Sequence, residues 1–156
     1  MKFRALRHYA FSLVEITLAL GVAAISMLAI LGLLATGSQL NHTATAQTAS
    51  TDILSAVAND LRATPGTTAT SLGYGITIPS NPVASETRTT LYFDSAGEAS
   101  TSQVSGSSYR LVLTFLPTGA GRFATPVSLR MSWPAAADPT SANTQSVEIF
   151  LALDRN

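Results

Sequence analysis

The stretch that decides the fold runs from Phe11 to Ala35 and reads FSLVEITLALGVAAISMLAILGLLA. Its last twenty residues, from Ile16 onward, contain only two polar side chains, Thr17 and Ser26. A helix rises about 1.5 Å per residue, so this length matches the roughly 30 Å hydrocarbon core of a bilayer. Because the stretch contains no proline, its backbone can stay hydrogen-bonded in lipid. The stretch therefore predicts a transmembrane helix.

The charges on either side of this helix predict its orientation in the membrane. Lys2, Arg4 and Arg7 precede it. No Asp, Glu, Lys or Arg occurs between Ile16 and Thr51. Basic residues are retained on the cytoplasmic side, so we expect a cytoplasmic N-terminus and an extracytoplasmic C-terminal part.

Glu15 is the one charged residue at the start of the apolar helix. A carboxylate there costs a few kcal/mol on insertion scales, so it calls for a partner. One alternative is that Glu15 lies at the membrane interface and is simply solvated. A second is an ordinary secretory signal peptide, with Ala35-Thr36-Gly37 as a small-x-small cleavage site, although the apolar run exceeds the usual roughly 7–15 residues.

The helical pattern continues beyond the apolar stretch. Four residues recur at spacings of three and four, namely Leu54, Val57, Ala58 and Leu61. The sequence Thr64-Pro65-Gly66 then signals a stop. We therefore expect one helix from about Ser12 to Ala63, whose second half is amphipathic and packs on a domain.

The C-terminal part contains short runs of β-forming residues separated by turn signals. These runs are Tyr74–Ile78, Thr90–Asp94, Tyr109–Leu116, Val127–Trp133 and Val147–Leu153. The order predicts an α+β fold, with the helix laid on one face of an antiparallel sheet of four or five strands. In the Tyr109–Leu116 run, Leu111, Leu113 and Phe115 should face one way, and Arg110, Val112 and Thr114 the other.

Composition offers little chemistry. The chain carries nine basic and nine acidic residues and no cysteine, so it predicts neither nucleic-acid binding nor thiolate chemistry. The histidines are His8 and His42, and His42 is expected to be exposed on the helix. The turn Asp94-Ser95-Ala96-Gly97, with Glu98, predicts a hairpin, and a calcium site is the alternative. We expect no catalytic residue, no metal, no cofactor and no enzymatic activity.

The string Tyr9-Ala10-Phe11-Ser12-Leu13-Val14-Glu15 resembles the type IV pilin and pseudopilin superfamily. The resemblance implies cleavage between Ala10 and Phe11 by a prepilin peptidase, and N-methylation of Phe11. It also implies that Glu15, the fifth mature residue, pairs with the N-terminal amine of a neighbouring subunit. Ala10 stands where the family usually has glycine, and Gly32 lies near the position where major pilins often carry proline.

A narrower resemblance covers most of the chain. The run TASTDILSAVANDLRATP from Thr48 to Pro65, the string Leu91-Tyr92-Phe93-Asp94 with Gly97, and the run Ser132-Trp133-Pro134-Ala135 look like the Verru_Chthon cassette protein B family. That family is encoded alongside other prepilin-like proteins. It implies a subunit of a multi-component system.

These inferences predict four segments. They are a basic leader (1–10), the transmembrane half of the helix (11–35), its extracytoplasmic half (36–63) and a β-rich head (64–156). The resemblance implies a minor pilin or pseudopilin of a type IV pilus-like or type II secretion-like assembly in the bacterial inner membrane. Its partners would be the peptidase, other pilin-like subunits and the lipid bilayer. The alternative is a membrane-tethered β domain that binds a surface or an exported ligand.

Overall fold

The structure is a computed structural model that describes residues 11–119, 124–138, 141 and 144–155. One helix is followed by five strands. Their bounds are α1 Leu13–Ala63, β1 Thr87–Phe93, β2 Ala99–Ser100, β3 Tyr109–Phe115, β4 Ala124–Trp133 and β5 Gln145–Asp154. The chain divides into two compact units, Met1–Thr43 and Ala44–Asn156, and α1 contributes to both. The α+β arrangement predicted from the sequence is confirmed.

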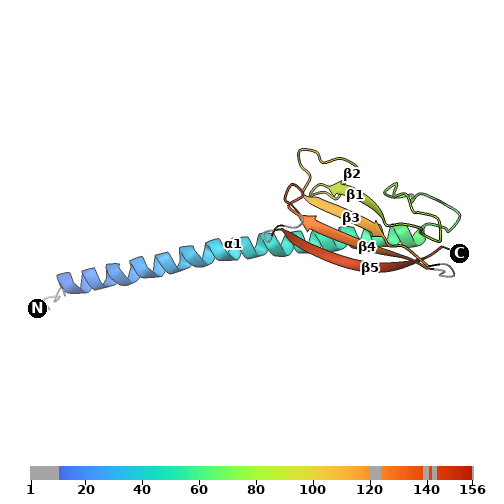
Figure 1. The fold of residues 1–156 in the computed structure, drawn as a ribbon. Coiled ribbons are helices and arrows are strands. Elements are labelled where there is room, and N and C mark those ends of the chain that lie inside the picture. The colour runs from blue at the N-terminus through green and yellow to red at the C-terminus, as the bar shows by residue number, and fades with distance from the viewer. Residues whose placement is uncertain (1–10, 120–123, 139–140, 142–143, 156) are drawn as a thin grey trace, which may run out of the picture. The chain divides into compact units, whose positions relative to one another are not determined.

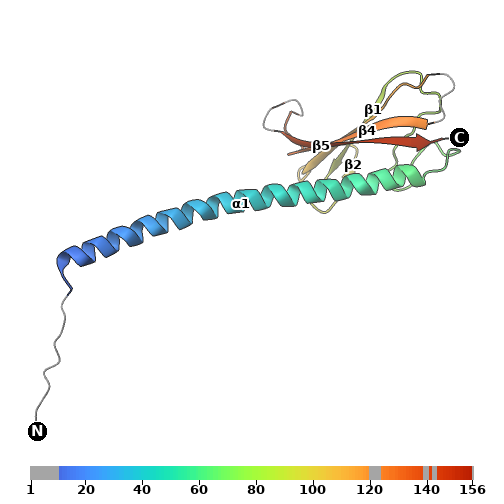
Figure 2. The same ribbon diagram turned by 90° about the horizontal axis from the view of Figure 1, so that it is seen from below.

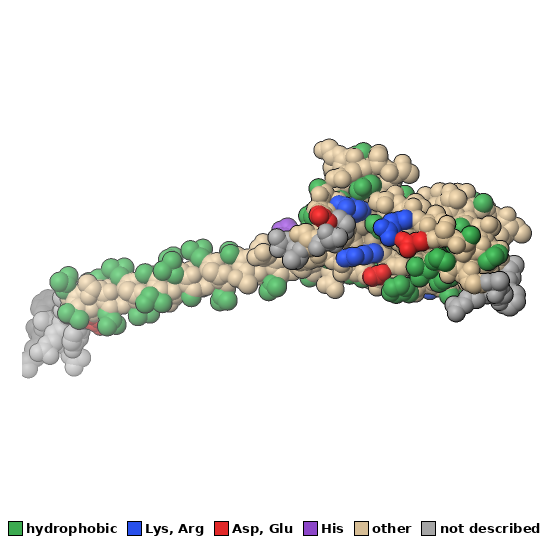
Figure 3. Space-filling model, in the orientation of Figure 1, with side chains coloured by type: hydrophobic (Ala, Val, Ile, Leu, Met, Phe, Trp, Pro, Cys, Tyr) green, Lys and Arg blue, Asp and Glu red, His purple; other side chains and the backbone are tan. Residues whose placement is uncertain are grey.

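The helix runs for 51 residues, from Leu13 to Ala63, as the sequence predicted. Within the first unit every described residue but Thr43 is exposed. Figure 3 shows hydrophobic side chains on this part of the helix. A soluble protein would bury such a surface, because apolar area in water is unfavourable. By length and composition, α1 is able to cross a membrane, and it lies near the N-terminus.

The second unit contains a single antiparallel sheet with the strand order β2-β1-β3-β4-β5 (Figure 1). The C-terminal part of α1 runs along one side of this sheet (Figure 2). Strands β1 and β3 pair from Thr87↔Phe115 to Phe93↔Tyr109. Strands β4 and β5 pair over ten residues, from Ala124↔Asp154 to Trp133↔Gln145. Strands that follow one another in the chain are also neighbours in the sheet, except that β3 pairs with β1 and not with β2.

One face of this sheet, here called the inner face, carries the hydrophobic core together with the second half of α1. Leu111, Leu113 and Phe115 are fully buried on it, whereas Arg110, Val112 and Thr114 lie on the opposite, outer face and are half-buried. The helix supplies its predicted stripe to the same core, namely Leu54, Val57, Ala58 and Leu61. The alternation in β3 and the 3–4 spacing in α1 are thus confirmed, because each period places apolar residues on one side.

Two details of the sheet differ from the prediction. Tyr74–Ile78 forms no strand and contributes only to an isolated bridge, Thr70↔Thr77. The fifth strand is instead β2, two residues that pair with the end of β1. Ile76 and Ile78 of the predicted run are nevertheless buried in the core. The alternating pattern correctly predicted that these side chains are buried. It did not predict a strand correctly, because a strand also needs a neighbouring strand to pair with.

Two charged residues attach the segment after the helix to the rest of the unit. The Asp60 carboxylate accepts hydrogen bonds from the backbone N–H groups of Gly73 (2.8 Å) and Tyr74 (3.2 Å). A Cβ on Gly73 would lie 3.0 Å from the Asp60 Cγ, so a larger residue there would push the carboxylate away by a few tenths of an ångström. Beyond β5, the Arg155 guanidinium donates to the carbonyls of Pro65 (2.9 Å) and Thr68 (2.7 Å).

We expect Asp60→Ala to lower the free energy of unfolding by about 1–2 kcal/mol, because two charge-assisted hydrogen bonds are lost at a partly exposed site. Urea denaturation of the full chain in detergent measures the change. Asp52→Ala is the matched control, since Asp52 is exposed on the same helix. Equal effects of the two substitutions would show that the Asp60 hydrogen bonds contribute nothing.

Candidate functional site

The start of α1 is built by Ser12, which precedes the first helical residue. The Ser12 Oγ accepts a hydrogen bond from the Glu15 backbone N–H at 3.2 Å. The Ser12 carbonyl oxygen accepts from the same N–H and from that of Ile16. Ser12 is thus the N-cap, and Glu15 occupies the third position of the helix, in the pattern S-x-x-E of a capping box.

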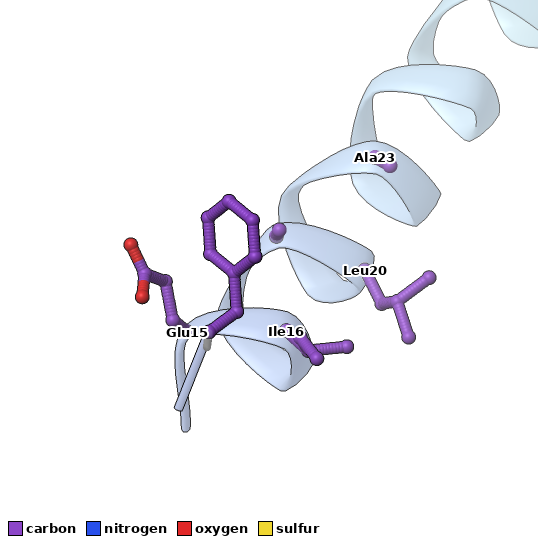
Figure 4. Close-up of a pocket in the computed structure, with 6 residues that line it drawn as sticks. Glu15, Ile16, Leu20 and Ala23 are labelled. Atoms are coloured by element: carbon purple, nitrogen blue, oxygen red, sulfur yellow. The ribbon is translucent and has the colours of Figure 1, made fainter. Parts of the chain in front are cut away.

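Phe11 and Glu15 line one open, apolar hollow beside the first turns of the helix. The other lining residues are Ile16, Ala19, Leu20 and Ala23. Figure 4 shows the Glu15 carboxylate extending on one side of the helix start, and Ile16 and Leu20 on the other. The small side chains of Ala19 and Ala23 leave the hollow open. Another apolar surface could therefore approach the helix backbone here.

The Glu15 side chain is exposed. Its carboxylate has no ion-pair or hydrogen-bond partner among the residues that the structure describes. A negative charge in the first turn is stabilised by the helix dipole, by about 0.3–1 kcal/mol. That gain is smaller than the cost of a charge placed in hydrocarbon, which is a few kcal/mol. In hydrocarbon the helix start alone would therefore stabilise Glu15 only in part.

The structure brings together two of the three predicted site residues, Phe11 and Glu15. The third, Ala10, lies outside the described residues, as do the whole leader and His8. The sequence analysis did not identify Ser12 as the N-cap, although the S-x-x-E spacing from Ser12 to Glu15 is a sequence signature of a helix start.

The candidate positions in the second unit form ordinary structural contacts. The Asp94 Oδ1 accepts from the backbone N–H groups of Ala96 (2.8 Å) and Glu98 (2.9 Å). Gly97 has a positive φ of 87°, and β1 pairs antiparallel with β2 across this turn, so the predicted hairpin is confirmed. No cluster of three or more His, Cys, Asp or Glu side chains that could hold a metal occurs among the described residues.

His42 and the tryptophan Trp133 have no site geometry around them. His42 is exposed on α1, as expected. Trp133 is half-buried, packs edge-on against Tyr109 with 6.4 Å between ring centroids, and donates its indole N–H to Gln145.

The strongest candidate site is therefore the helix start with Phe11, Ser12 and Glu15. Comparison of the chain with protein-family models, with curated proteins and with solved structures found no match.

Proposed function

We propose that the chain is a prepilin-like structural subunit, a minor pilin or pseudopilin of a type IV pilus-like or type II secretion-like assembly. In this proposal the basic leader keeps the N-terminus in the cytoplasm and α1 spans the inner membrane. A prepilin peptidase then cleaves between Ala10 and Phe11, and the new amine of Phe11 is methylated. The anchored subunit is afterwards assembled with other pilin-like subunits into a filament.

One observation carries this proposal, which is the exposed Glu15 carboxylate near Phe11, at the start of a helix whose next twenty residues carry no charge. A membrane tether needs no such charge, because every Asp or Glu within a span raises the cost of insertion. A subunit that docks laterally gains from it, since opposite charges attract strongly where water is excluded. The amine of a neighbouring Phe11 would supply the missing cation.

Mass spectrometry of the membrane-fraction protein tests the processing step. In a host with an active prepilin peptidase we expect a mature chain that begins with N-methylated Phe11. Ala10→Gly should be processed at least as completely, because it restores the residue usual before the cut, and Ala10→Val is the matched variant expected to block cleavage. An intact Met1 terminus in that host would contradict the proposal.

The alternative function is a membrane-tethered β domain that binds a surface or an exported ligand. In that case α1 acts only as an anchor, and the charge at Glu15 has no role. The two functions therefore differ in the effect of neutralising Glu15, which is considered in the Discussion.

A further inference from the structure

One stretch of α1 lies between the apolar run and the part of the helix that packs on the sheet. The apolar run ends at Ala35. The first apolar residues of the helix that pack against the hydrophobic core are Ala46 and Ala49. We call residues 36–43 the polar segment. Its first seven residues are exposed and Thr43 is half-buried, so it is helical without the tertiary packing that stabilises most helices in proteins.

The sequence of the polar segment, TGSQLNHT, favours a helix only weakly. Six of these eight residues are Thr, Gly, Ser, Asn or His, which rank below Ala, Leu and Gln as helix formers. Gly37 is the least favourable of them, because glycine loses the most backbone entropy when it becomes helical. A Cβ added at Gly37 would meet no other atom within 4 Å, so no close contact explains a glycine there.

Interactions between side chains do not compensate for this weak preference. No Asp, Glu, Lys or Arg occurs between Ile16 and Thr51, so the polar segment cannot form the i,i+4 ion pairs that support isolated helices. At its start the Thr36 hydroxyl donates to the Gly32 carbonyl at 3.1 Å, a contact that slightly destabilises a helix. Restarting a helix beyond an opening requires a new and costly nucleus, so the open form should be a minority.

The residues that follow the polar segment set a limit to such an opening. They read ATAQTAST and also contain three threonines and one serine. Here, however, Ala46 and Ala49 pack against the core, and Ser50 is 0% exposed. Opening this part of the helix would break buried contacts, whereas opening the polar segment exposes almost no surface that is not exposed already.

We propose that the polar segment unfolds locally and reversibly while the parts of α1 on both sides of it stay helical. Exposed backbone hydrogen bonds and few buried contacts are the properties that make local opening easy. The packed part is held by the core. The apolar part is held by lipid, in which a backbone without hydrogen bonds is costly; this step rests on the membrane anchoring proposed above. While the segment is open, flexible chain alone joins the two parts of α1, and each can reorient independently.

Amide hydrogen exchange of the full chain in detergent micelles, resolved by NMR, tests the proposal. We expect amides of residues 39–43 to exchange at least about a hundredfold faster than those of Leu54, Val57 and Leu61, which are buried in the core. Amides of residues 20–30 should also exchange slowly. Equal protection along the helix would overturn the proposal. Fast exchange over the whole of 36–63 would overturn it too, because the packed part would then open together with the segment.

Two paired variants test the physical cause. Gly37→Ala combined with Ser38→Ala should slow exchange in the polar segment by about tenfold, since alanine is the better helix former at both positions. Gly21→Ala combined with Ser55→Ala makes the same two changes at exposed positions of the same helix and should leave exchange in the segment unchanged. If the first pair had no effect, or both pairs had the same effect, weak helix preference would not be the cause and the proposal would fail.

This test is separate from that of the proposed function. Exchange in the polar segment requires neither cleavage before Phe11 nor the charge of Glu15. Glu15→Gln should therefore show the same exchange as the unchanged chain, whether or not it assembles.

Discussion

Glu15→Gln is expected to abolish filament assembly while leaving the helix start and membrane insertion intact. Glutamine also suits the third position of a capping box, so the Ser12 cap is kept and only the charge is removed. Loss of one partner of a buried ion pair costs about 3–5 kcal/mol, which corresponds to more than about a hundredfold in the subunit–subunit equilibrium. The yield of sheared filaments, compared with the amount of chain in the membrane fraction, measures this effect.

Two further variants make the interpretation specific. Thr17→Ala changes a polar residue two positions further along the helix, whose hydroxyl donates to the Val14 carbonyl, so assembly should be unchanged. Glu15→Asp keeps the charge on a shorter side chain and should retain part of the assembly. If Glu15→Gln assembled as well as the wild-type chain, the helix would be an anchor only, and the tethered binding domain would be the better description.

Phe93→Ala is expected to give the largest loss of stability among substitutions in the second unit, about 3–5 kcal/mol in the free energy of unfolding. Phe93 is 0% exposed on the inner face of β1. It also packs edge-on against Tyr74, with 5.7 Å between the ring centroids. Removing the ring leaves a cavity that contacts both the sheet and the segment held by Asp60. Denaturation of the full chain, followed through the fluorescence of its single tryptophan, measures the loss.

Phe150→Ala is the matched control for this prediction. The same side chain is removed from a strand of the same sheet, but Phe150 is 70% exposed on the outer face. We therefore expect a change within about 0.5 kcal/mol, as for other surface substitutions. Comparable losses in the two variants would mean that the inner face is not the main core of the sheet.

Local patterns predicted most of the secondary structure correctly. The helix bounds followed from the apolar run and from the stop at Thr64-Pro65-Gly66, which are properties of neighbouring residues. β1, β3, β4 and β5 were found from their runs of β-forming residues, although β1 and β4 begin three residues earlier than predicted. Strand β2 was missed because two residues carry no periodic signal, and it exists only because the turn at Gly97 returns the chain to β1.

The candidate site at the helix start was predicted from the sequence, but the contacts of Asp60 were not. The spacing from Phe11 to Glu15 could be read from the sequence, and the helix start does bring these two residues to one hollow. The contacts of Asp60 with Gly73 and Tyr74 could not be predicted. They span thirteen and fourteen positions, and they depend on how the intervening segment folds back on the helix.

The sequence by itself therefore determined that a long helix, apolar in its first half and with one carboxylate near its start, precedes a small antiparallel sheet. The length of an apolar run and the alternation of apolar residues depend only on residues close together in the sequence, so they can be recognised without knowledge of any tertiary contact. Only the tertiary structure decided the order of the strands, and with it which strands form the edges of the sheet. It also decided the contact of Arg155 with Pro65, ninety positions away in the segment just after the helix. Such features depend on the path of the whole chain, because residues far apart in sequence become neighbours only when the sheet and the helix have packed together.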